Sequence, residues 1–116
     1  MAVKRIVADL HADDPDASRS FYQDVLGLEV AMDRGWIVTF ASPGDRRVQL
    51  SVMAGDASAP VAPDVSVEVD DVDAAHAAAI ARGDEIVHPL TDEPWGVRRF
   101  FVRDPSGKVI NILVHR

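Results

Sequence analysis

The sequence predicts an α+β fold, in which two βαβββ modules form a curled mixed sheet around a cleft with the helices outside. The same order of elements (strand, helix, three strands) occurs on both sides of a segment rich in Ala and Pro, residues 54–63. Local sequence repeats too: DPDAS at 14–18 corresponds to DVDAA at 71–75, each before a helix that ends in Gly. We therefore expect a single domain, 1–116, with module one at 1–53, a linker at 54–63 and module two at 64–116.

Module one begins with an alternating strand, Val3–His11, in which small or apolar residues face one side and mixed residues the other. A helix follows, with Asp14 as N-cap, Pro15 at its first position and Gly27 after its end. Turn residues then separate three strands, which we place at residues 28–32, 36–41 and 47–53.

Module two repeats this order. Residues 65–69 alternate as a half-buried strand, and Asp71 opens an alanine-rich helix that ends at Gly83. The segment 91–96 predicts a long acidic loop that closes over the cleft with Trp95 as its lid. The three strands of this module are placed at residues 85–89, 97–103 and 108–115.

The last two strands form a hairpin around Asp104-Pro105-Ser106-Gly107, because Pro presets the turn, Asp and Ser bond the local backbone and Gly supplies a positive φ. On the second strand the aliphatic residues 110, 112 and 114 share one face, which we expect under a helix. Asn111 then lies on the opposite face, toward the cleft.

Composition excludes several functions. The length fits one domain, and the net charge of −7 argues against nucleic acid or an anionic membrane surface as partner. Without Cys there is no disulfide, thiolate nucleophile or Cys-based metal site. The N-terminal residues lack the apolar core of a signal peptide, and no apolar run is long enough to span a membrane, so we expect a cytoplasmic protein.

The motifs SFYQDVLGL at 20–28 and FVRDPSGK at 101–108, taken with the βαβββ repeat, resemble the vicinal oxygen chelate superfamily. That superfamily includes glyoxalase I, bleomycin-resistance proteins, fosfomycin-resistance enzymes and extradiol dioxygenases. The resemblance covers essentially the whole chain and implies the fold. It leaves the function open, because this scaffold carries binding proteins, isomerases, transferases and oxygenases.

Metal-dependent members of that superfamily place ligands on the first and last strand of each module. The resemblance puts those four positions at Val7, Gln49, Asp64 and Asn111, where the relatives typically carry His or Glu. Valine binds no metal, neutral amides bring no charge, and a catalytic transition-metal site usually needs three His or carboxylate ligands. We therefore expect no metal cofactor.

The inner faces of the strands predict a small-molecule pocket, aromatic and apolar with a few polar groups. The predicted ligand-binding residues are Asp9, His11, Trp36, Phe40, Gln49, Ser51, Asp64, Ser66, Trp95, Arg99, Phe101 and Asn111. The leading function is metal-independent binding of a small, partly apolar molecule, similar to the bleomycin-resistance proteins that act by sequestration. Carboxylates at positions 9, 64 and 68 would suit a cationic ligand.

Other interpretations remain open. The chain could be a lyase- or isomerase-type enzyme with Asp9 or His11 as base, or with a divalent metal held through Asp64. The aromatic residues could belong to a core or dimer interface, Gln49 and Asn111 could satisfy each other, and Arg99 could pair with Asp9 or Glu68. We expect a homodimer, and a dimeric module without a small ligand is the third possibility.

Overall fold

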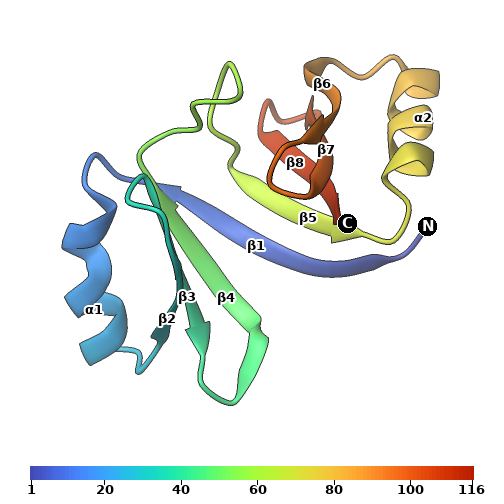
Figure 1. Cartoon of the computed structure of the whole chain (residues 1–116). Coiled ribbons are helices and arrows are strands. Elements are labelled where there is room, and N and C mark those ends of the chain that lie inside the picture. The colour runs from blue at the N-terminus through green and yellow to red at the C-terminus, as the bar shows by residue number, and fades with distance from the viewer.

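The computed structural model describes all 116 residues. Eight strands form one sheet in the order β2-β3-β4-β1-β5-β8-β7-β6. They are β1 (Val3–His11), β2 (Glu29–Asp33), β3 (Ile37–Ser42), β4 (Asp45–Met53), β5 (Val65–Val69), β6 (Ile86–Glu93), β7 (Val97–Arg103) and β8 (Val109–His115). Figure 1 shows the sheet as a curved surface with a helix toward each end.

The strand pairing repeats in the two modules. β1 runs parallel to β4 and β5 runs parallel to β8, while the remaining neighbours within each module are antiparallel. The modules join at the centre of the sheet, where β1 and β5 pair antiparallel. The expected fold class is therefore confirmed, and the two modules pair within one chain.

Each module carries its helical segment between its first and second strands. In module one a 3-10 turn, η1 (Pro15–Ser18), leads into α1 (Arg19–Asp24), with the Asp14 carboxylate accepting from the backbone of Asp16. In module two α2 (Val72–Arg82) is capped by Asp71, whose carboxylate accepts from the backbone N of Ala74, and Gly83 ends it at φ 79°. Both predicted N-caps are confirmed.

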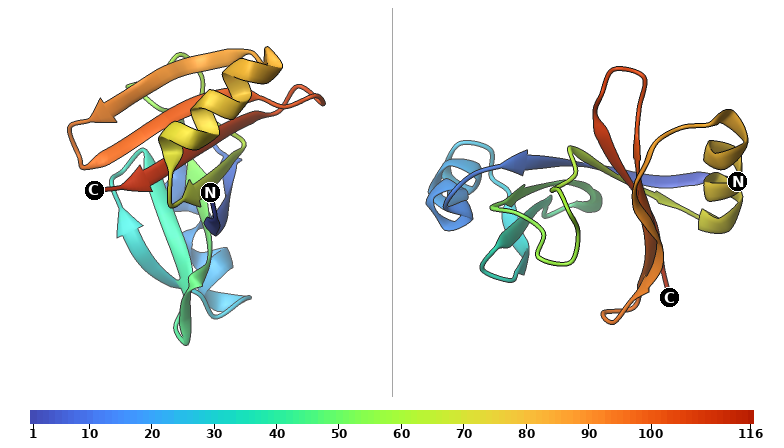
Figure 2. Two further views of the ribbon diagram at one scale, coloured as in Figure 1. Left: turned by 90° about the vertical axis from the view of Figure 1, so that its right-hand side faces the viewer. Right: turned by 90° about the horizontal axis from the view of Figure 1, so that it is seen from above.

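Two separate apolar clusters lie between the sheet and these helices. α2 packs on Phe100, Val102 and Val69, and the aliphatic face of β8 closes this cluster as expected. The cluster of module one is smaller and holds Phe40 and Val52, with Tyr22 packed against them. Figure 2 shows α1 and α2 at opposite ends of the molecule, so the two clusters do not merge.

The hairpin between β7 and β8 forms as predicted. Asp104 organises the turn, because its Oδ1 accepts from the backbone N of Ser106 and of Lys108, both at 2.9 Å. These donors and the Ser106 hydroxyl hold the pKa of Asp104 below its usual value. Gly107 adopts φ 88°, a conformation that favours glycine.

One loop prediction is wrong. β6 continues to Glu93, so only residues 94–96 connect it to β7, in place of the long loop expected at 91–96. The pairs Thr91 with Arg99 and Asp92 with Arg98 extend the antiparallel ladder through that acidic segment. Trp95 therefore stands in a tight hairpin turn.

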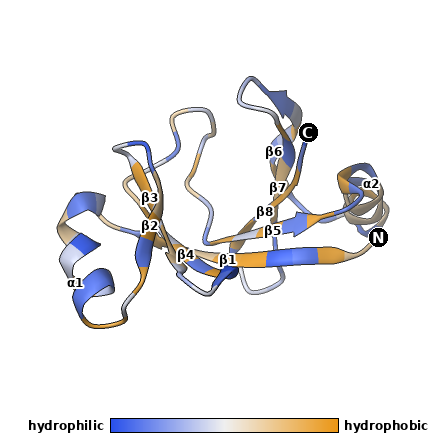
Figure 3. Cartoon of the chain, turned by 60° about the horizontal axis from the view of Figure 1, so that its bottom comes forward, coloured by the Kyte–Doolittle hydropathy of each residue, from blue (hydrophilic) through white to orange (hydrophobic).

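The convex face of the central strands has no helix over it. On β1 the cleft-side residues Val7 and Asp9 are buried, whereas Ile6 and Leu10, on the opposite side, are 63% and 41% exposed. Val48 on the neighbouring strand β4 is exposed as well. Figure 3 shows hydrophobic segments of β1 running between the two helices. No helix is long and apolar enough to cross a bilayer.

Candidate functional site

The concave face of the sheet encloses a cavity of about 720 Å³ between the two modules. Trp36 and Trp95 line it from opposite modules, and Val7, Met53 and Leu113 add apolar surface. Side chains do not fill this space, which counts against the interpretation of the chain as a dimeric module without a ligand cavity.

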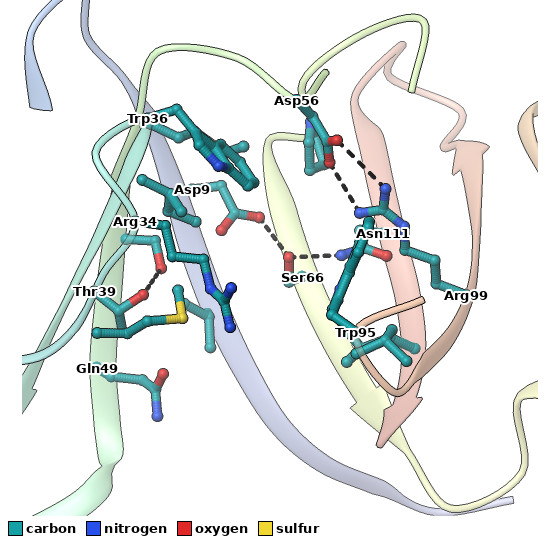
Figure 4. A pocket seen from close by; sticks show the side chains of 18 of the residues that line it. Asp9, Arg34, Trp36, Thr39, Gln49, Asp56, Ser66, Trp95, Arg99 and Asn111 are labelled. Carbon is teal, nitrogen blue, oxygen red and sulfur yellow. Dashed lines mark hydrogen bonds and ion pairs between the residues drawn. The ribbon is translucent and has the colours of Figure 1, made fainter. Parts of the chain in front are cut away.

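Three polar side chains form a hydrogen-bonded chain on the floor of this cavity (Figure 4). Asp9 on β1 accepts from the Ser66 hydroxyl at 2.6 Å, and Ser66 on β5 accepts from the Asn111 amide on β8 at 3.1 Å. Strand register explains the arrangement, because Ser66 lies opposite Val7 on one side and Asn111 on the other. The pseudo-equivalent strands of both modules therefore contribute to one polar group.

Asp9 is the titratable residue among these three hydrogen-bonded side chains. Burial raises the pKa of Asp9 from 3.8 to about 6, against the lowering effect of the Ser66 hydrogen bond and of nearby His11. Asp64 and Asp56 add a small repulsion that also raises it. A carboxyl group of this kind exchanges its proton close to neutral pH, which is the property of a general acid or base.

Arg99 organises the other end of the cavity. Its guanidinium bonds Asp56 in the linker at 2.9 Å, Ser58 at 2.8 Å and Glu93 on β6 at 3.3 Å. The guanidinium carbon lies 5.2 Å from the Trp95 ring centroid and 4.8 Å from that of Phe101. Arg99 therefore ties the linker and the β6–β7 turn to β7 and holds Trp95 against the cavity.

Asp56 is almost wholly enclosed by this arrangement, with 3% of its side chain exposed. Burial by itself would raise the pKa of Asp56, but hydrogen bonds from Arg99 and Ser58 hold that pKa below its usual value. The carboxylate is thus ionised and committed to Arg99. The residues at 54–63 were expected to act only as a linker, yet they supply part of the cavity wall.

The structure brings eight of the predicted residues to the cavity: Asp9, Trp36, Gln49, Ser51, Ser66, Trp95, Arg99 and Asn111. Gln49 and Asn111 do not satisfy each other, because Gln49 donates to the backbone of Arg46. Ser51 exchanges a 2.7 Å hydrogen bond with Thr39 across β3 and β4. The expected ion pair of Arg99 exists, with Asp56 and Glu93 in place of Asp9 or Glu68.

Phe40 does not face the cavity, and its assignment to the cleft is wrong. It is fully buried on the helix side of β3, against Tyr22 at a ring distance of 5.1 Å. Trp36 stands just before β3, outside the alternation of that strand, and the cleft-side residues of the strand are Ile37 and Thr39. In residues 36–40 both faces of the strand are apolar except at Thr39, so alternation does not tell which face is buried. The Thr39 hydroxyl was the one sequence feature that indicated the cavity side.

Three further predicted residues lie beside the cavity without lining it. His11 donates from Nε2 to the backbone carbonyl of Pro63 at 3.0 Å. This hydrogen bond gives the imidazole a structural role. The carboxylate of Asp64 accepts from the backbone N of Val109 at 2.8 Å, so it braces the start of β8. Phe101 is fully buried beneath Arg99 and supports that guanidinium from the protein side.

Sequence reasoning missed Asp56, Ser58 and Arg34. The first two belong to the segment interpreted as a linker, and their spacing from Arg99 in sequence carries no signal of contact. Arg34 belongs to the turn between β2 and β3, and Figure 4 shows its side chain reaching into the cavity.

A family model for the glyoxalase/bleomycin resistance protein/dioxygenase superfamily matches residues 4–112. The chain belongs to this superfamily. The match spans both modules, and the expected resemblance is thereby confirmed. A comparison with curated proteins finds no match.

Solved structures of glyoxalase-superfamily folds resemble the chain over nearly its whole length. A glyoxalase/bleomycin resistance protein/dioxygenase superfamily member from Vibrio splendidus is 23% identical, with a TM-score of 0.74 and coverage of 99% of this chain and 100% of that one. A methylmalonyl-CoA epimerase from Streptomyces coelicolor, in complex with 2-nitronate-propionyl-CoA, is 18% identical, with a TM-score of 0.71 and coverage of 98% and 99%. At these identities the likeness shows the fold.

A protein from Legionella pneumophila described as an NAD-dependent benzaldehyde dehydrogenase matches equally well. It is 19% identical, with a TM-score of 0.74 and coverage of 96% of this chain and 99% of that one. Structural neighbours of this glyoxalase-like chain thus carry different functional names, and the fold does not select one of them.

The residues at the family's metal positions do not fit a catalytic transition-metal site. The register corrects one assignment. In the β1–β4 pair Ala8 lies opposite Leu50, which puts Val7 beside Gln49, and in the β5–β8 pair Ser66 lies opposite Asn111. Ser66, and not Asp64, is therefore the module-two counterpart of Val7. The four positions therefore hold Val7, Gln49, Ser66 and Asn111, which are all neutral. A catalytic transition-metal site normally has several imidazole or carboxylate ligands.

Proposed function

We propose that the cavity binds a small, partly apolar molecule directly, without a metal ion. The observation that carries this proposal is that the four positions of the family's metal ligands hold the uncharged residues Val7, Gln49, Ser66 and Asn111. They lie in an aromatic cavity of about 720 Å³. That volume is in the range of cavities that take drug-sized ligands, and apolar walls with a few placed polar groups are their usual lining.

The groups in the cavity have separate tasks in this proposal. Trp36 and Trp95 supply large contact surfaces at a low cost in side-chain entropy. The chain of Asp9, Ser66 and Asn111 gives the ligand an orientation through hydrogen bonds. The argument for a cationic ligand is weakened, because Asp64 is bonded to Val109 and Glu68 is paired with Arg5 and His115.

A thermal-shift screen in a buffer with EDTA tests this function. We expect ligands that raise Tm by several degrees in wild type, because a ligand that binds only the folded state stabilises it. Trp36→Ala, which removes cavity surface, should reduce these shifts, whereas Arg47→Gln, at an exposed side chain that does not line the cavity, should preserve them. If no ligand is found without added metal, and many are found with it, the proposal is wrong.

The second candidate is an isomerase- or lyase-type enzyme that uses Asp9 as the base. The specific observation in its favour is the burial of Asp9 in the cavity, with a pKa of about 6. The structural likeness to methylmalonyl-CoA epimerases agrees with this candidate. His11 is no longer part of it, since its ring nitrogen bonds the carbonyl of Pro63 and His11 does not line the cavity. Exchange of solvent deuterium into a bound ligand, lost in Asp9→Asn, would favour the enzyme over the binding protein.

We also propose that the protein is a homodimer that covers the convex apolar strip of Ile6, Leu10 and Val48. Exposed apolar strips of this kind usually mark protein interfaces. The strip lies on β1 and β4, and its residue Ile6 also pairs with Val67 on β5, where the two modules join. A two-fold dimer would bring this strip against its own copy, as isologous interfaces do.

A further inference from the structure

Ser66 fixes the direction of the hydrogen bonds on the cavity floor. Its Oγ lies 2.6 Å from Asp9 Oδ2 and 3.1 Å from the amide of Asn111. A hydroxyl donates one hydrogen, and an ionised carboxylate only accepts, so the hydrogen of Ser66 points to Asp9. Ser66 can then only accept from Asn111, which must turn its Nδ2 toward Ser66.

This direction leaves Asn111 Oδ1 as a free acceptor. Asn111 is 7% exposed, lines the cavity and has no hydrogen-bond partner for Oδ1. Buried carbonyl oxygens are nearly always paired, so this enclosed atom is the place where a ligand N–H or O–H would be recognised, once a small turn of the Asn111 side chain presents it to the cavity. A ligand that offers only acceptors would leave it unsatisfied.

Arg34 gives the cavity a second recognition group. Three other arginines line the cavity and are each paired with a carboxylate: Arg5 with Glu68, Arg46 with Glu29 and Arg99 with Asp56. Arg34 makes no ion pair, and Figure 4 shows its guanidinium in the open middle of the cavity. A free guanidinium beside apolar walls favours a planar anion that it can bond with two N–H groups.

We propose that the ligand of this cavity is an apolar carboxylic acid that also carries an N–H or O–H donor. Its carboxylate pairs with Arg34, its donor bonds Asn111 Oδ1, and its apolar body packs on Trp36 and Trp95. This inference rests on the proposed binding function and narrows it to one class of ligand. The net charge of the chain is −7, but the local charge inside the cavity differs from it, because the unpaired Arg34 selects an anion.

Matched sets of four aromatic compounds test the inference, with phenyl, naphthyl and indolyl bodies. Within each set one member carries a carboxylate and a hydroxyl, one has the hydroxyl methylated, one has the carboxylate as its methyl ester, and one has both changes. Calorimetric titration gives the dissociation constant of each compound, because the indolyl and naphthyl bodies absorb and emit where the two cavity tryptophans do. We expect the doubly functional member to bind at least tenfold more tightly than either singly changed member.

Variants assign each preference to its residue. Arg34→Gln should abolish the advantage of the carboxylate and keep that of the hydroxyl, and Asn111→Leu should do the reverse. If Asn111→Leu does not fold, Ser66→Ala replaces it, because the released amide can turn its donor to the cavity and the hydroxyl advantage should fall. Arg47→Gln, outside the cavity, should leave all four affinities unchanged.

The outcomes are distinguishable. If methylation and esterification leave the affinity unchanged, or improve it, the ligand class is wrong while the binding function stands. If the preferences persist in Arg34→Gln and Asn111→Leu, the assigned residues are wrong. If no member of any set binds, and the broad screen also finds no ligand, both the inference and the proposed function are overturned.

Discussion

The guanidinium of Arg99 on β7 and the carboxylate of Asp56 in the linker form an ion pair of 2.9 Å, with 6% and 3% of their side chains exposed. This pair joins two segments that are far apart in sequence and closes one end of the cavity. Glu93, also buried, shares the same guanidinium at 3.3 Å. The wall of the cavity therefore depends on one arginine.

Arg99→Met should destabilise the protein strongly, because it leaves the buried carboxylate of Asp56 without its cation and Glu93 with only the His88 ring beside it. Removing one partner of a buried ion pair costs about 3–5 kcal/mol of unfolding free energy. Urea denaturation measures this loss. Arg47→Met is the matched control, since its ion pair with Asp45 is exposed and should contribute below about 1 kcal/mol. Equal losses in the two variants would contradict the role of Arg99.

Asp9→Asn should stabilise the protein at neutral pH and change its pH dependence. The pKa of Asp9 rises from 3.8 in the unfolded chain to about 6 in the fold, so the folded state holds the proton more tightly. The stability that this supplies is complete below pH 4 and is lost as the pH rises to about 6, with a total of roughly 3 kcal/mol as an upper bound.

The amide introduced by Asp9→Asn can still accept from Ser66 and carries no titratable proton. The advantage of this variant over wild type should therefore grow between pH 4 and pH 6 and then stay constant. Unfolding free energies of both proteins across this range provide the check. A difference that does not vary with pH would contradict the burial of an ionisable Asp9.

Much of the fold could be predicted from the sequence, because it depends on local signals. The caps Asp14 and Asp71, the glycine after each helix and the turn at 104–107 act within a few residues of themselves. The doubled order of elements then set the topology, since each module repeats one pattern of pairing.

The site was harder to predict, because its contacts join residues that are far apart in the sequence. Asp56 meets Arg99 across 43 residues, and nothing in the linker sequence marks that contact. The phase of β3 was ambiguous since both of its faces are apolar, so Phe40 was assigned to the wrong side. Asp64 was aligned by counting along the strand, whereas the register puts Ser66 opposite Asn111.

Ile6→Lys should weaken the proposed homodimer without unfolding the chain. A charged side chain at the centre of an apolar interface is costly to bury, whereas in the monomer it would stand in water. Light scattering after size-exclusion chromatography measures the mass. Ile80→Lys, at an exposed position on α2 outside the strip, should remain dimeric. A wild-type protein that is monomeric at high concentration would contradict the dimer.

The triple variant Val7→His, Ser66→His, Asn111→Glu should gain a divalent metal site. The register places these three positions side by side on β1, β5 and β8, and the substitutions supply the imidazole and carboxylate ligands that wild type lacks. Titration with Co²⁺, followed by its visible absorption, should show one site per chain in the variant and none in wild type. Similar binding by the two proteins would contradict the conclusion about the donor set.

Calorimetric titration of the strongest cavity ligand into protein stripped with EDTA tests the central claim most directly. Direct binding predicts one ligand per chain, with a dissociation constant that is the same before stripping, after stripping and after a divalent ion is added back. Binding that disappears on stripping and returns with the ion would show that a metal mediates recognition, and would contradict the account.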